Sequence, residues 1–156
     1  MTAKTIAAST YETDFHDWVQ QQAELLKARR WEDLDIENLI EEIEDLGASK
    51  RDALVSQIAR LYLHLLKWHH QAHRRSRSWE LSIKDARIEI TDLLADNPSL
   101  KSRLPELTAK GYSKARRQAE AQTSLAIDTF PIEPAFSFEQ AMEVDFMAQG
   151  QPDETV

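Results

Sequence analysis

Apolar residues recur every three or four positions along most of the chain, the spacing of one face of an α-helix. The first such segment covers 14–30, with Asp14 placed to cap it, and the second covers 35–47, with Asp35 as cap and Gly47 as its end. The faces expected to be buried are Phe15, Trp18, Val19, Gln22, Leu25 and Leu26 in the first helix and Ile36, Leu39, Ile40, Ile43 and Leu46 in the second.

The same spacing predicts three longer helical segments in the middle of the chain. A third helix begins at Ser49 and carries a wide apolar arc, so we place it near the centre of the bundle. A fourth helix, capped by Ser78, ends before Asn97-Pro98. A short helix at 98–103 and a longer one from Pro105 to about Thr123 follow, because proline is favourable only in the first turn.

The last part of the chain has two prolines and no helical period. We expect residues 124–136 to form an extended strap that packs on the bundle through Leu125, Ile127, Phe130 and Phe136, followed by a short helix at 138–146. The tails 1–9 and 148–156 are expected to be disordered. The predicted fold is therefore all-α: a single-domain bundle of five to six helices over residues 10–147, with an extended C-terminal strap and a short last helix.

Composition restricts the chemistry and the location. The 156 residues include no cysteine, which excludes disulfides, thiolate zinc sites and cysteine nucleophiles. The start of the chain lacks the apolar stretch of a secretory signal, and no window is long and apolar enough to cross a bilayer. We expect a cytoplasmic, acidic, soluble protein that has no membrane contact and needs no cofactor.

Six short stretches resemble a bacterial family that is common in cyanobacteria, domain of unknown function family 29. They are YETDFHDW (11–18), ENLIEEIEDLG (37–47), HLLKW (64–68), RSRSW (75–79), NPSL (97–100) and DTFP (128–131), in family order. The resemblance implies a compact helical fold. It carries no established activity, so no catalytic or binding residue is transferred from it.

Eight acids and no Lys or Arg lie between residues 32 and 45. Glu37, Glu41, Glu42, Glu44 and Asp45 are expected on the side of the helix opposite the apolar stripe. We call Glu37, Glu41, Glu44 and Asp45 the acidic face, and we call Arg74, Arg75 and Arg77 the basic collar. Such dense charge favours a counter-charge. It could come from within the chain (the basic collar, Lys50 or Arg51), from a protein partner, or from a divalent metal, and plain solvation of the acids is a further alternative.

The metal alternative has one specific form. Glu41, Glu42 and Asp45, together with Glu89 and Asp92, resemble the paired acidic motifs of all-α nucleoside triphosphate pyrophosphohydrolases, in which carboxylates hold magnesium. Because Glu41 and Asp45 point away from the apolar stripe, the helical geometry opposes a shared site. A magnesium-dependent nucleotide phosphohydrolase is the alternative function.

Histidines border the apolar arc of the third helix. For His64 we predict a structural hydrogen bond to a carboxylate such as Asp14 or Asp17. His69 and His73 are spaced to supply two imidazoles, but a zinc site needs a third protein ligand, so the sequence leaves metal binding here open. Trp68 and Trp79 are expected in the core.

We do not expect nucleic-acid binding. The basic collar and Lys67 supply few cations for phosphate contacts, and the formal net charge of the chain is −8. Because no nucleophile, base and orienting group occur together, the chain is expected to be non-enzymatic. We expect a protein-interaction module that uses the acidic face and the basic collar to contact an unknown protein partner or a second copy.

Overall fold

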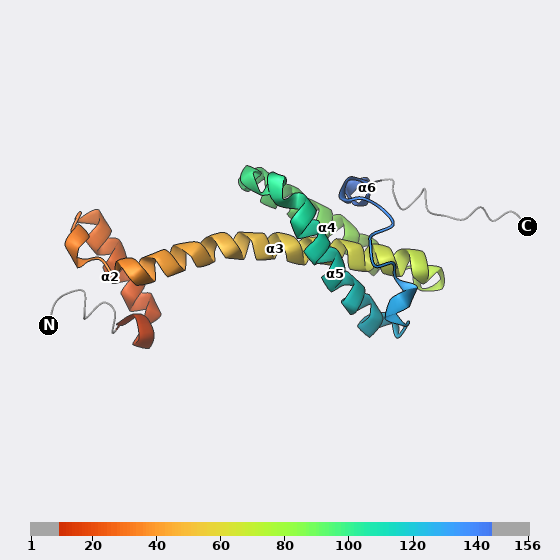
Figure 1. The fold of residues 1–156 in the computed structure, drawn as a ribbon, viewed down its shortest axis with the longest axis horizontal. Coiled ribbons are helices and arrows are strands. Elements are labelled where there is room, and N and C mark those ends of the chain that lie inside the picture. Colours follow the sequence, from red (N-terminus) through yellow and green to blue (C-terminus); the bar gives the residue numbers. More distant parts are fainter. Residues whose placement is uncertain (1–9, 145–156) are drawn as a thin grey trace, which may run out of the picture. The chain divides into compact units, whose positions relative to one another are not determined.

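The computed structural model describes residues 10–144, and every regular element in that range is a helix, which confirms the all-α fold class (Figure 1). The α-helices are α2 (Phe15–Lys27), α3 (Ile36–His70), α4 (Arg77–Asp96), α5 (Leu104–Thr123) and α6 (Phe138–Met142). The 3₁₀ turns are η1 (Trp31–Asp33), η2 (Ala72–Arg74), η3 (Pro98–Arg103) and η4 (Ile127–Thr129). The predicted tails 1–9 and 148–156 lie outside the described residues. The last helix was predicted over 138–146, but it ends at Met142, because Glu143 leaves the helical conformation.

The chain divides into two compact units, residues 1–49 (unit 1) and residues 50–156 (unit 2), with the boundary inside α3. Unit 1 contains α2 and the first turns of α3. Unit 2 contains the later turns of α3 together with α4, α5, the strap and α6. The expectation of a single domain over 10–147 remains a prediction.

The predicted break between the second and third helices is wrong, because α3 runs as one helix of 35 residues from Ile36 to His70. Gly47 keeps a helical conformation, and its φ is not positive. A glycine inside a helix costs only about 1 kcal/mol relative to alanine, and the helix-favouring residues on both sides of it outweigh that cost. Ser49 consequently lies inside the helix and caps nothing.

A buried carboxylate joins α2 to the start of α3 within unit 1. Asp35 accepts a hydrogen bond from Trp18 Nε1 at 3.1 Å and one from Asn38 Nδ2 at 2.8 Å. Its backbone N–H donates to Gln22 Oε1 at 2.9 Å. Asp35, Trp18 and Gln22 are all buried. Asp14 caps α2 as predicted, by accepting from the backbone N–H of Asp17.

The core of unit 2 lies where α3, α4 and α5 pack together. Leu54, Ile58, Leu61 and Leu65 of α3 are fully buried, and Ile83 and Ile90 of α4 complete the same cluster. Gly111 allows α5 to approach α3 closely, because a Cβ at this position would lie 2.6 Å from Ile58 Cγ2. Gly111 therefore has a packing role.

The strap, residues 124–136, is fixed to α5 by side chains that donate hydrogen bonds to its backbone carbonyls. Arg116 donates from Nε to the carbonyl of Phe130 at 2.8 Å and from a terminal nitrogen to that of Ile127 at 3.2 Å. The Tyr112 hydroxyl donates to the carbonyl of Pro131. Phe130 and Phe136 are buried as predicted. The last helix starts with a capping box formed by Ser137 and Gln140.

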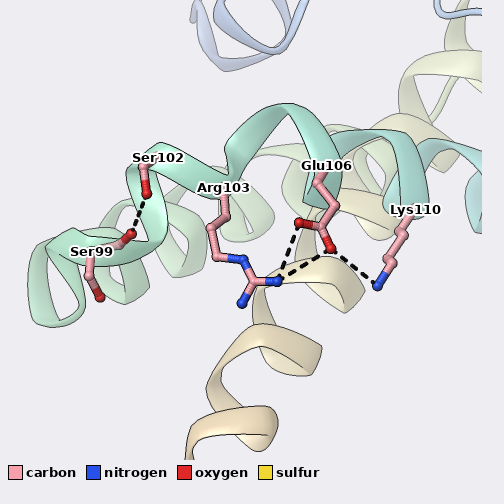
Figure 2. Close-up of polar contacts among 5 residues, drawn as sticks. All are labelled: Ser99, Ser102, Arg103, Glu106 and Lys110. Atoms are coloured by element: carbon pink, nitrogen blue, oxygen red, sulfur yellow. Dashed lines mark hydrogen bonds and ion pairs between the residues drawn. The ribbon is translucent and has the colours of Figure 1, made fainter.

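The first turn of α5 is held by a local cluster of polar contacts (Figure 2). Glu106 lies 3.3 Å from an Arg103 guanidinium nitrogen and 3.6 Å from Lys110 Nζ. The hydrogen bond from Arg103 is the main cause that lowers the pKa of the Glu106 carboxyl below its usual value of 4.5. In η3, Ser102 donates to the carbonyl of Ser99. The helix begins at Leu104, one residue before the predicted Pro105.

Two smaller expectations need correction. The N-cap of α4 is Ser76, which accepts from the backbone N–H of Trp79, and not Ser78. Trp68 and Trp79 are only partly buried. A cation lies over each ring, Arg75 at 4.8 Å from Trp68 and Lys67 at 4.7 Å from Trp79. These tryptophans therefore lie at the edge of the core, beneath charged side chains.

Alanine at the two helical glycines should have opposite effects. Gly47→Ala should stabilise the helical state by up to about 1 kcal/mol, because nothing lies within 4 Å of the new Cβ. Gly111→Ala should destabilise unit 2 by about 1–2 kcal/mol, because overpacking against Ile58 exceeds the gain in helix propensity. Denaturant unfolding followed by circular dichroism measures both, and destabilisation by Gly47→Ala would contradict the continuous helix.

Asp35→Ala should lower the free energy of local unfolding of unit 1 by about 2 kcal/mol, because the buried Trp18 Nε1–H loses its acceptor. Asp35→Asn keeps an acceptor oxygen and should cost clearly less. Hydrogen exchange of the Trp18 indole N–H, followed by NMR, reports the local opening directly. Equal exchange rates in both variants would show that this bond does not hold α2 to α3.

Candidate functional site

An apolar groove of about 400 Å³ runs between α2 and the first turns of α3 in unit 1. Figure 1 shows these two segments beside each other at the start of the chain. Eight of the ten side chains that line the groove are apolar, and the other two are Gln22 and Glu42. The apolar members are Phe15, Trp18, Val19, Ala23, Leu26, Leu39, Ile43 and Leu46.

Most of this apolar surface was expected to be buried, and that expectation is wrong. Ile43 is 65% exposed and Leu46 is 66% exposed. On the same helix Ile36 and Ile40 are about half exposed, and Phe15, Val19 and Leu26 of α2 are also exposed. Two helices cover each other along one line only, so the remaining width of each apolar face is left open to solvent.

Unit 1 is strongly acidic. Residues 10–49 include twelve Asp or Glu and three Lys or Arg, a formal charge of −9, whereas the whole chain carries −8. All four residues of the acidic face are exposed. Among residues 10–144 none of these four carboxylates forms an ion pair. The groove therefore belongs to a segment with a large negative formal charge.

Glu42 was expected on the side opposite the apolar stripe together with the acidic face, and that expectation is wrong, because Glu42 lines the groove and is partly buried. Its Oε1 accepts a hydrogen bond of 2.7 Å from the Tyr11 hydroxyl. This bond is the main cause that raises the pKa of Tyr11 above its usual value of 10. The Tyr11 ring meets Phe15 and Trp18 edge-on, with centroids 5.8 and 4.8 Å apart.

Two arginines of the basic collar have partners close in sequence. Arg75 donates from Nε to the carbonyl of Trp68 at 2.9 Å, in addition to its position over that ring. Arg77 forms an ion pair of 3.4 Å with Glu80. Arg74 is exposed at the end of η2. Pairing between the basic collar and the acidic face remains a prediction.

The predicted partner of His64 is replaced by a backbone group. Nδ1 of His64 lies 2.8 Å from the carbonyl oxygen of Arg60, one turn earlier in α3, so this nitrogen donates. A carbonyl one turn away is available without any tertiary contact, which explains why neither Asp14 nor Asp17 is needed. Burial is the main cause that lowers the pKa of His64 and also those of His69 and His70.

The candidate metal ligands form no assembled centre in the part of the chain that the structure describes. No group of three or more His, Asp or Glu residues there is arranged to hold an ion. This applies to the carboxylates of the phosphohydrolase alternative, Glu41, Glu42, Asp45, Glu89 and Asp92, and to His69 and His73. Within residues 10–144, no helix combines the length and apolar character that crossing a membrane requires.

The groove itself was missed from the sequence, although eight of its ten residues, all but Ala23 and Glu42, were assigned to the apolar faces of the two predicted helices. Periodicity reports that a face is apolar, but not whether a third helix covers it. The available signal was the charge, because the segment with the uncovered face also holds the unbalanced acids.

Acidification from pH 7.5 to 5.5 should lower the free energy of unfolding of unit 2. His64 in the unfolded chain takes up a proton near its usual pKa of 6.5, whereas the lowered pKa in the folded state delays protonation, so stability falls as the pH drops below about 6.5. His64→Gln should reduce this loss, and His16→Gln, an exposed control in α2, should reduce it less. Denaturant titrations at the two pH values test this, and an unchanged loss in His64→Gln would contradict it.

Comparison with known proteins agrees with the resemblance read from the short stretches. No curated protein and no solved structure matches the chain. The model of one family, Domain of unknown function DUF29, matches residues 10–147, which include both the groove and the core of unit 2. The chain therefore belongs to the family Domain of unknown function DUF29.

Proposed function

We propose that unit 1 is a protein-docking module whose groove receives an amphipathic helix of another protein, with Lys or Arg flanking the apolar ridge of that helix. The observation that carries the proposal is an open apolar groove within a segment of formal charge −9. The apolar lining supplies the driving force for burial, and the surrounding acids define the charge of the occupant.

A helix fits the groove because the groove is formed by two helices. Side chains spaced three and four apart on an incoming helix pack between the rows of α2 and α3, as in other helix-in-groove complexes. The occupant would cover Ile43, Leu46 and Phe15, which are now at least 48% exposed. Covering these side chains completes the burial that their periodic spacing anticipates.

Charge favours a basic partner over a second copy of the chain. Two copies joined through this groove would bring two segments of formal charge −9 together, and like charges at an interface are destabilising. A helix with flanking Lys or Arg is instead attracted by the negative charge of Glu37, Glu41 and Glu44, which lie on the other side of α3, are exposed and form no ion pair in residues 10–144.

Binding of labelled peptides to the full chain tests the proposal. The probes are Leu/Lys amphipathic peptides of about 18 residues, or five helical turns, a Leu/Glu peptide of the same pattern, and a scrambled Leu/Lys peptide. Fluorescence anisotropy should show saturable binding of the patterned Leu/Lys peptide alone. Ile43→Asp and Leu46→Asp should weaken it about tenfold or more, and Ile88→Asp, at an exposed apolar position of α4, should not.

Charge variants separate the two parts of the proposal. Changing Glu37, Glu41 and Glu44 to Gln should weaken binding of the Leu/Lys peptide. The matched neutralisation of three exposed acids in unit 2, Glu89, Asp92 and Glu120, should weaken that binding less. Equal binding of the scrambled peptide, or no effect of Ile43→Asp, would overturn the proposal. A dimer that sediments at micromolar concentration and is lost in Ile43→Asp would show that a second copy is the occupant.

A further inference from the structure

Glu42 is the one acid among the ten residues that line the groove. Its neighbours Glu41 and Glu44 are exposed, whereas Glu42 is partly buried and faces the apolar side chains of α2. A carboxylate at this position is costly once an occupant excludes water, unless the occupant supplies a donor. Covering the groove would therefore desolvate Glu42 but not the exposed acids.

The Glu42 carboxylate is held in place but keeps capacity for a further donor. The Tyr11 hydroxyl donates to Oε1, and the Tyr11 ring rests against Phe15 and Trp18, which also line the groove. An ionised carboxylate accepts several hydrogen bonds through its two oxygens, and one from Tyr11 leaves most of that capacity. A cationic side chain entering the groove would meet a fixed acceptor.

We propose, as an extension that rests on the proposed function, that Glu42 selects an occupant whose apolar ridge is interrupted by one Lys or Arg. The ammonium or guanidinium group of that residue pairs with the Glu42 carboxylate inside the groove, while the flanking cations are attracted at longer range by the charge of the acidic face. A wholly apolar ridge leaves Glu42 covered and without a compensating charge, which lowers its affinity. The acidic face contributes to affinity for any basic helix, and Glu42 decides which basic helix binds.

A lysine scan of the bound peptide tests the selection. Each apolar position of the patterned Leu/Lys peptide is changed in turn to Lys or to norleucine, which has a similar length and no charge. With the wild-type full chain, one position should bind about tenfold more tightly as Lys than as norleucine, and Lys should weaken binding at the others.

The variants Glu42→Gln and Glu41→Gln provide the matched comparison. Glu42→Gln retains an acceptor for Tyr11 but removes the charge, and it should abolish the preference for Lys at that position. Glu41 is the adjacent, exposed residue. Glu41→Gln should weaken binding of the Lys peptide and of the norleucine peptide alike, so the ratio of their affinities should stay unchanged.

The possible results separate this inference from the proposed function. If the parent peptide binds with the sensitivity to Ile43→Asp described above, but no position prefers Lys or Glu42→Gln keeps the preference, the selection by Glu42 is overturned and the docking module stands. If the parent peptide does not bind at all, both are overturned.

Discussion

The structure depends on the continuity of α3 through Gly47. One helix supplies the packing surface for α2 in unit 1 and for α4 and α5 in unit 2. In unit 2 the apolar arc of α3 is covered. Gly111 has no side chain, so α5 packs directly against Ile58 of α3. In unit 1 the same helix is partnered by α2 along one line, so part of its apolar stripe forms a groove.

The elements were largely predictable because local rules determine them. The Asp14 cap, the Ser137–Gln140 capping box and the restriction of Pro105 to the first turn of a helix each depend on a few neighbouring residues. The break at Gly47 was predicted wrongly because glycine is only a weak helix breaker. Its preference for ending a helix is decided by whether the following residues continue the helical pattern, and here they do.

The strap and the candidate site were less predictable because tertiary contacts define them. Nothing in the pattern assigns Arg116 and Tyr112 to the carbonyls of Phe130 and Pro131, since irregular backbone has no repeating hydrogen-bond scheme. The acidic residues were identified, but Glu42 was grouped with possible metal ligands, whereas its contact is with Tyr11. Whether an apolar helical face lies inside a core or remains open depends on how many helices surround it.

The division of charge between the two units has a consequence that begins before any contact forms. Residues 50–156 contain as many Lys and Arg as Asp and Glu, so the formal net charge of the chain arises from its first third. A cationic molecule diffusing nearby is drawn toward that part of the surface and is partly oriented on the way. Its encounter rate then depends on ionic strength, because dissolved salt shortens the range of the field to about 8 Å under physiological conditions.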